Sequence, residues 1–411
     1  MKNIFPHFIQ EKHLRGEENG AFEAYTMFID LSGFTRMTEA LMKRGNDGAE
    51  RLSNILNGVF APMVSLVYRR GGSIPYFAGD AFTAIFSKED SQIDAVGVLA
   101  TAQEQMLFLS KVTKEFEEVE IRAKIGLSFG RVEWGIVGEN YKSYYYRGEA
   151  IDGCAFSQKY AEENQIIADQ NFFDKLPNII TAEQISDKKY YLLESPEDVQ
   201  NTGFEAAVAS SNGREGKNIL PELKEEVVSK FLPEPVYNFN QQGEFRRVIS
   251  VFVSFKGVPN HDSLNDFTSV ILDQFNYFSG YFKEVDFGDK GGVLLGFFGA
   301  PVSFENNVER ALEFVDSVKE DLAPIQEKTD LQFKVGITAG VAYTGLVGGN
   351  ERSQYAAVGN RVNIAARLMS KAQWGEVLVD EDIQKSRFFK FKHQGDIPYK
   401  GLAEPIPTYK L

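Results

Sequence analysis

Apolar and polar positions along the chain follow two periodicities, one typical of strands and one typical of helices. Short apolar runs predict strands at Tyr25–Leu31, Arg122–Phe129 and Ile166–Ala168. Apolar residues at helical spacing predict helices over Met37–Tyr68 and Ser91–Glu118, with a third from about Ala150 to Glu163. Helices placed between neighbouring antiparallel strands predict an α+β, ferredoxin-like sheet with helices on one face.

This pattern occurs twice in the chain. The segment AKIGLSFGRVEWGIVGENYKSYYYRGEAIDGCAF aligns with FKVGITAGVAYTGLVGGNERSQYAAVGNRVNIAAR. The alignment pairs Lys124 with Lys334, Gly126 with Gly336, Gly138 with Gly348, Gly148 with Gly359 and Asp152 with Asn363. The apolar strand at the start of the first copy matches Arg247–Phe255, and the Gly79-Asp80 turn is matched with Gly288-Asp289. A repeat of this size is a domain.

We therefore expect two domains, residues 21–194 and 246–411, that form a pseudo-twofold pair within one chain. Between them, residues 195–245 contain four prolines and the stretch SSNGREGKN, which predict a linker with one short helix at Glu222–Phe231. A length of 411 residues suits two domains.

Charge and cysteine usage narrow the class of protein. The net charge of −14 argues against a nucleic-acid or anionic-membrane partner. A single cysteine, Cys154, excludes an intrachain disulfide and fits a reducing compartment. The first residues lack an apolar core of signal-peptide length, and Val248–Phe255 is far shorter than the ~18 residues of a membrane span. We expect a soluble, cytoplasmic protein.

The stretch FIDLSGFT places a carboxylate, Asp30, at the end of an apolar strand and before a helix. The free N–H groups at such a helix N-terminus attract phosphate, so we expect the turn to bind substrate phosphates through Ser32, Gly33, Phe34 and Thr35. The alternative is that Asp30 only caps the helix.

A second carboxylate, Asp80, lies in the turn of YFAGDAFTAIF, between two apolar strands. Taken alone, this is an ordinary hairpin turn. Taken with Asp30, it could complete a site for two hard divalent cations, which prefer carboxylate and phosphate oxygens.

The stretch VGNRVNIAARLM puts Asn363 and Arg367 on one helical face. An amide beside a guanidinium suits a ribose and a phosphate oxygen, although a surface helix can carry the same pair without any function.

In order and spacing, FIDLSGFT, FAGDA, GDKGG and VGNRVNIAARLM resemble the class III adenylyl and guanylyl cyclases, most closely the tandem-domain soluble adenylyl cyclases. The resemblance implies one active site between the two domains, which would convert ATP to 3′,5′-cyclic AMP and pyrophosphate with two Mg²⁺ or Mn²⁺ ions. Metal ligands would be Asp30, Asp80 and the carbonyl of Leu31. Substrate would be contacted by Lys124 at the triphosphate, Lys290 at the purine, Asn363 at the ribose and Arg367 at the transition-state phosphates.

Each copy lacks what the other supplies, because Ser254 matches Asp30, while Asp152 and Phe156 match Asn363 and Arg367. One site per chain follows, and a monomer should suffice for activity. Two alternatives stay open, a guanylyl or mixed-specificity cyclase and a non-catalytic nucleotide-binding protein.

The sequence departs from the resemblance at three positions. Ala356 occupies the place of the usual purine-reading Asp or Thr, which loosens the expected selectivity for ATP. Tyr76 and Ala155 occupy the places of the Lys and Arg of bicarbonate-activated members, so we do not expect activation by that mechanism.

Overall fold

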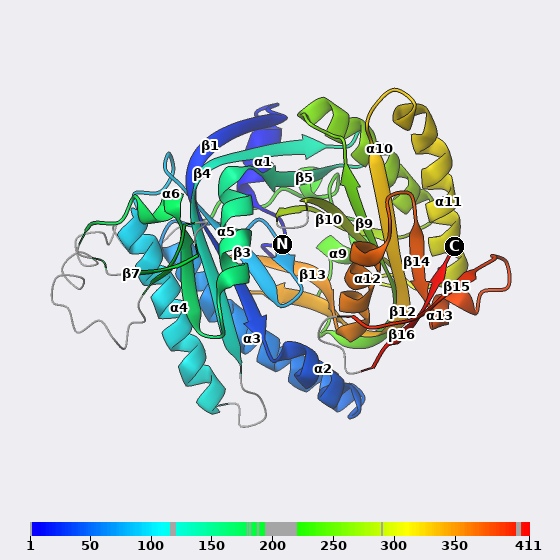
Figure 1. Cartoon of the computed structure of the whole chain (residues 1–411), viewed down its shortest axis with the longest axis horizontal. Helices are drawn as coiled ribbons and strands as arrows, with labels where there is room; N and C mark the ends of the chain where they lie inside the picture. The colour runs from blue at the N-terminus through cyan, green and yellow to red at the C-terminus, as the bar shows by residue number, and fades with distance from the viewer. Residues whose placement is uncertain are drawn as a thin grey trace.

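The computed structural model of the chain contains two sheets with the same strand order (Figure 1). It describes residues 2–115, 121–178, 180, 182–186, 189–193, 220–288, 291–399 and 404–411. The first sheet has the order β2-β3-β1-β4-β6-β8-β7 with β5 beside β4, and the second has β10-β11-β9-β12-β14-β16-β15 with β13 beside β12. The predicted pair of α+β domains is confirmed.

The first half contains β1 (Asn19–Ser32), α2 (Phe34–Met42), α3 (Asn46–Arg69), β2 (Phe77–Ala78), β3 (Ala81–Ser87), α4 (Ala95–Glu115), β4 (Arg122–Val137), β5 (Ser143–Arg147), α5 (Glu149–Tyr160), β6 (Gln165–Asp169), α6 (Gln170–Phe173), β7 (Ala182–Ser186) and β8 (Tyr190–Leu193). Two of its predicted helices are confirmed with shifted ends. The helix expected over Met37–Tyr68 is instead two helices, α2 and α3, because Gly45 between them adopts a positive φ of 62° that ends the helical path.

The second half contains β9 (Glu244–Lys256), α10 (His261–Tyr277), β10 (Tyr281–Gly288), β11 (Gly291–Phe298), α11 (Asn307–Gln326), β12 (Gln332–Gly348), β13 (Ser353–Val358), α12 (Asn360–Lys371), β14 (Val377–Asp380), α13 (Glu381–Gln384), β15 (Lys392–Ile397) and β16 (Ile406–Lys410). Helices α5 and α12 lie between the two sheets, whereas α10 and α11 flank the second sheet on its outer side (Figure 1).

Strand registers confirm most of the predicted repeat. Asp30 on β1 is opposite Lys124 on β4, and Ser254 on β9 is opposite Lys334 on β12. A Cβ atom at Gly126 would collide with the backbone of α5, and one at Gly336 with the backbone of α12. The two glycines therefore let each helix lie directly on its sheet.

Each half extends strands that pack into the core of the other half. The ends of β12 and β13 place Tyr343, Val347, Ala356 and Val358 in the apolar core of the first half. In return, Val137 and Tyr145 of β4 and β5 lie in the core of the second half. Because each core contains side chains from the other half, the relative position of the halves is fixed by packing.

The N-terminal segment and the described part of the predicted linker pack together. Helix α1 (His7–Leu14) and the one-turn helices α8 (Glu225–Val228) and α9 (Glu234–Tyr237) belong to this layer. Ile4, Phe5, Leu223 and Val227 are buried in one cluster. The helix predicted over Glu222–Phe231 is thus only α8, and the rest of the linker, residues 195–219, lies outside the described residues.

Candidate active site

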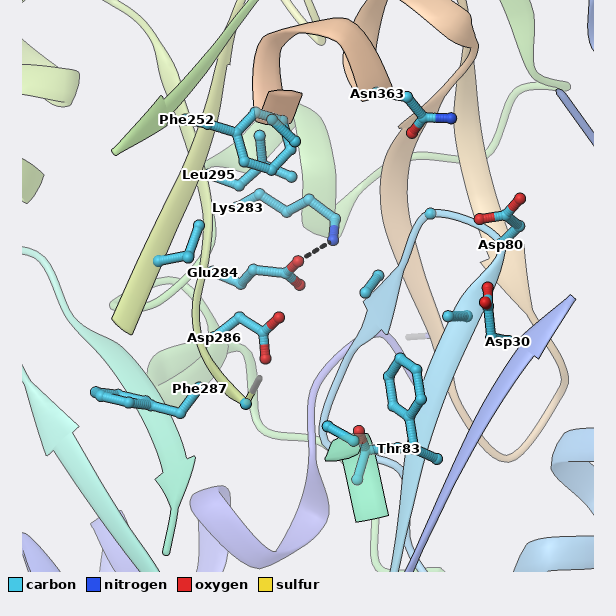
Figure 2. Close-up of a pocket in the computed structure, with 18 of the residues that line it drawn as sticks. Asp30, Asp80, Thr83, Phe252, Lys283, Glu284, Asp286, Phe287, Leu295 and Asn363 are labelled. Atoms are coloured by element: carbon cyan, nitrogen blue, oxygen red, sulfur yellow. Dashed lines mark ion pairs between the residues drawn. The ribbon is translucent and has the colours of Figure 1, made fainter. Parts of the chain in front are cut away.

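Asp30 and Asp80 come together at one end of the first sheet. Asp30 lies near the end of β1, opposite Ala81, which directly follows the Gly79-Asp80 turn. The backbone N–H of Leu31 donates to the carbonyl oxygen of Asp80 at 3.2 Å, which ties the strand end to the turn. Figure 2 shows the two carboxyl groups beside each other at the cavity wall.

The electrostatics of this pair suit a divalent cation. Burial and the neighbouring Asp30 carboxylate raise the pKa of Asp80 to about 7. The Gln158 Nε2 group donates to Asp30 Oδ2 at 2.8 Å and orients that carboxylate. Two adjacent carboxylates that disfavour each other's charge are stabilised by a metal ion, so the residues fit Mg²⁺ or Mn²⁺. Among the described residues, no three or more His, Cys, Asp or Glu side chains are grouped so that they could hold a metal ion, so further ligands would come from nucleotide phosphates, water or backbone oxygens.

Asn363 and Arg367 lie on α12, which begins after Gly359 and faces the first half. Asn363 lines the same cavity as the two aspartates (Figure 2). The Arg367 Nη1 atom is buried and has no hydrogen-bond partner among the described residues, and burial lowers the pKa of this guanidinium. Burying a cationic donor without a partner costs free energy unless an anion accepts its hydrogen bond.

The cavity between the halves has a volume of about 300 Å³ and a pseudo-twofold wall. Equivalent positions from both halves contribute in pairs, namely Phe28 with Phe252, Ala81 with Val293, Thr83 with Leu295, Ile151 with Val362, Ala155 with Ala366 and Gln158 with Met369. The charged and amide groups do not follow this symmetry, because Asp30 and Asp80 come from the first half, whereas Lys283, Glu284, Asp286 and Asn363 come from the second.

Three charged residues of β10 line the cavity, although the sequence analysis did not predict them as site residues. Lys283 and Glu284 form an ion pair of 2.6 Å with side chains only 1% and 6% exposed, and Asp286 follows on the same strand (Figure 2). The signal for them is the segment YFKEVDFG, in which three charges interrupt an apolar strand next to the Gly-Asp turn.

The remaining predicted site residues lie on the strand beside Asp30, away from the cavity wall or outside the described residues. Lys124, directly opposite Asp30 on the neighbouring antiparallel strand, shares its face of the sheet. Ser32, Gly33 and Phe34 are not part of the cavity wall, and Phe34 is buried in the core of the first half. The Thr35 side chain and the whole of Lys290 lie outside the described residues.

The structure corrects two of the sequence-based assignments. Ala356 does not line the cavity, because its side chain is buried in the first core, and its neighbour Ala357 lines the wall instead. The match of Gly288-Asp289 with Gly79-Asp80 is also wrong in register. Ala81 is opposite Asp30, whereas Val293 is opposite Ser254, so the hairpin of the second half is longer and Gly292 takes the place of Asp80.

Comparison with known proteins agrees with this fold and site. The sequence model described as the adenylate and guanylate cyclase catalytic domain matches residues 20–188 and 287–411. The chain therefore belongs to the family of class III nucleotide cyclase domains.

Among curated proteins, it is similar to adenylate cyclase type 10 of Homo sapiens, with 27% identity over 445 residues that include 99% of this chain. It is also similar to adenylate cyclase type 10 of Rattus norvegicus, with 28% identity over 95% of this chain. The chain spans only 27% and 26% of the length of those relatives.

A solved structure, a class III adenylyl cyclase-like ATP-binding protein from Pseudomonas aeruginosa, matches 93% of both chains with a TM-score of 0.65 and 13% identity. This likeness supports the two-domain fold. Among the described residues, no helix is long and apolar enough to cross a membrane.

Proposed function

We propose that this chain is an adenylyl cyclase, which converts ATP to 3′,5′-cyclic AMP and pyrophosphate at one site between its halves. The observation that carries the proposal is that Asp30 and Asp80 of the first half face the same cavity as Asn363 of the second. The names of the mammalian relatives, adenylate cyclase type 10, support the choice of ATP.

In this proposal Asp30, Asp80 and the Leu31 carbonyl hold two divalent cations. When bound, these ions lower the pKa of the ribose 3′-hydroxyl and neutralise charge on the phosphates. Asn363 orients the ribose by hydrogen bonding, so that its 3′-oxygen faces the α-phosphorus. Arg367 donates its Nη1 hydrogens, which no described residue accepts, to the phosphate oxygens as negative charge builds up. Lys124 binds the triphosphate, and Lys290 reads the purine.

The pseudo-twofold counterpart of this site lacks the same chemistry. Ser254 and Gly292 replace the two aspartates, and Asp152 and Phe156 replace Asn363 and Arg367. We propose that turnover occurs at one site per chain and that a monomer suffices.

A guanylyl or mixed-specificity cyclase is a second candidate, which the β10 carboxylates favour. Glu284 and Asp286 line the cavity and, when ionised, only accept hydrogen bonds. Guanine presents N–H donors on two adjacent atoms of its pairing edge, whereas adenine presents one donor group beside an acceptor. A carboxylate that reached this edge would therefore favour GTP.

The test is to incubate the purified chain with Mn²⁺ and either ATP or GTP, and to separate the products by chromatography. Cyclic AMP with a higher kcat/KM for ATP supports the proposal. Cyclic GMP with a higher kcat/KM for GTP supports the second candidate. Nucleotide binding without any cyclic product would leave a non-catalytic nucleotide-binding protein.

A further inference from the structure

The strand that leads into the Gly79-Asp80 turn lies at the edge of its sheet. Strand β2 has only two residues and pairs with β3 on one side. An edge strand leaves a row of backbone N–H and C=O groups without a strand partner, and such groups cost free energy when they are buried. Residues 74–77, which precede the turn, are buried, so their backbone groups need partners from elsewhere.

Side chains of the second half provide these partners at Phe77. The Phe77 backbone N–H donates to Gln354 Oε1 at 2.8 Å, and Lys283 Nζ donates to the Phe77 carbonyl oxygen at 2.6 Å. Gln354 lies on β13 and Lys283 on β10. Together they take the place of the missing neighbouring strand.

Arg352 binds the backbone of Ile74 and Pro75, slightly earlier in the same segment. It is fully buried, and its Nε donates to the Ile74 carbonyl at 3.2 Å while its Nη2 donates to the Pro75 carbonyl at 2.8 Å. The Tyr144 hydroxyl, which accepts from Arg352 Nη2 at 3.2 Å, donates to the same Pro75 carbonyl at 2.9 Å. The guanidinium thus donates to two backbone carbonyls and one tyrosine hydroxyl of the first half, while its Nη1 donates to the Ser353 carbonyl beside it.

The side chains that hold Phe77 are themselves held by one carboxylate. Glu284 pairs with Lys283 at 2.6 Å and accepts from Gln354 Nε2 at 3.3 Å. A buried polar network in which each member has a partner is rigid. Figure 2 shows the Lys283–Glu284 pair across the cavity from the Asp80 turn.

From this arrangement we propose that Arg352, Gln354 and Lys283 are positioning residues for the metal-binding turn of the first half. The proposal rests on the proposed role of Asp80 as a metal ligand. Only Ala78 and Gly79 separate Phe77 from Asp80, and Gly79 has a positive φ of 69° that glycine adopts freely. The second half therefore contributes to metal binding without touching the metal, by fixing the backbone from which Asp80 extends.

The test measures Mn²⁺ binding to the full chain without nucleotide, by electron paramagnetic resonance of the free ion. Gln354→Met keeps the side-chain length but removes the acceptor for Phe77. Groups that hold a metal ligand in place are typically worth about 10–100-fold in metal affinity, so we expect Mn²⁺ binding to weaken at least ~10-fold. The nucleotide KM at saturating Mn²⁺ should stay within about twofold, because the variant leaves the substrate-contacting groups in place.

Asn265→Leu is the matched control. The Asn265 Oδ1 atom also accepts a backbone N–H of the first half, that of Gly138, at 2.8 Å, but it lies on α10, away from the turn. This variant removes one hydrogen bond of the same kind, and its Mn²⁺ binding should equal that of the wild type.

Arg352→Lys is the second test variant, and it decides the outcome if Gln354→Met does not fold. One ammonium cannot replace the several donors of the guanidinium, so Mn²⁺ binding should again weaken. Folded Gln354→Met and Arg352→Lys proteins with wild-type Mn²⁺ binding would overturn the positioning role. Asp80→Ala separates the two proposals, because intact Mn²⁺ binding in that variant would refute the metal site itself.

Discussion

Asp80 is a carboxyl group held where both burial and a like charge oppose its ionisation. Its partner Asp30 accepts a hydrogen bond from Gln158, and Arg367 on α12 has a buried donor without a partner in the part of the chain that the structure describes. An ionised Asp80 therefore needs a nearby positive charge, and the Arg367 guanidinium needs a nearby anion. A divalent cation and a polyphosphate would together balance them, which is the residue-scale reason for the proposed chemistry.

The two aspartates and their counterpart Ser254 give the first prediction. Asp30→Ala and Asp80→Ala should each lower kcat by about 10²-fold or more, because each removes a charged ligand that stabilises the transition state. Ser254→Ala should change kcat by less than about twofold, since the second half holds no proposed metal there. Cyclic nucleotide formation under saturating Mn²⁺ measures this. If Ser254→Ala lost activity and Asp30→Ala kept it, the assignment of the active site to the side of Asp30 would be contradicted.

The raised pKa of Asp80 gives a pH prediction. Between the ordinary value of 3.8 and about 7, the native Asp80 holds a proton that the unfolded chain has released. The contribution of Asp80 to the stability of the metal-free protein therefore falls as the pH rises through this range and levels off above about 7. Mn²⁺ binds the ionised form, so it should raise Tm more at pH 8 than at pH 6.

Calorimetric Tm values for the wild type and Asp80→Asn, with and without Mn²⁺, measure this effect. The wild type should lose more stability than Asp80→Asn as the pH rises from about 4 to 7. Identical pH profiles for both proteins would show that Asp80 does not titrate in this range.

At the scale of single elements, β13 separates two adjacent alanines by the alternation of side chains along a strand. Ala356 points into the core of the first half, and Ala357 lines the cavity. A sequence comparison chooses between such neighbours by counting positions from Asn363, and it selects Ala356. Which alanine lines the cavity depends on which face of β13 packs against the first half. This is a feature of the tertiary structure, and the spacing of residues along the sequence does not determine it.

The alanine pair predicts opposite phenotypes. Ala356→Asp should lower stability by about 3–5 kcal/mol, because it leaves an uncompensated charge in an apolar core. Ala357→Thr should instead change the ATP-over-GTP ratio of kcat/KM, since it adds a hydroxyl to the cavity wall. Denaturant unfolding and parallel kinetics with both nucleotides measure the two effects. If Ala356→Asp were as stable as the wild type and changed the base selectivity, residue 356 would line the cavity and the assignment of its side chain to the core would be wrong.

At the scale of the whole molecule, the repeat and the fold class could be predicted from the sequence, because the fold class depends on local periodicity. The repeat was visible in matched glycines such as Gly126 and Gly336, on which a helix of each half packs directly. Lys283, Glu284 and Arg352 could not be predicted in this way. The roles of Lys283 and Arg352 come from contacts with residues more than 200 positions away, as in the bond from Lys283 to Phe77 and that from Arg352 to Pro75. Glu284 acts through its contacts with Lys283 and Gln354, and the second of these also depends on the tertiary fold. Through the same contacts, the second half holds the turn of the first half that we propose to bind metal.

The most direct test of the central claim is to mix two inactive chains. Asp30→Ala lacks a proposed metal ligand of the first half, and Arg367→Ala lacks the proposed phosphate-binding cation of the second. If the active site forms within one chain, an equimolar mixture should remain as inactive as either variant, and wild-type activity per molecule should not change on dilution. Recovery of cyclic nucleotide formation in the mixture would show that the site forms between chains and would contradict the account.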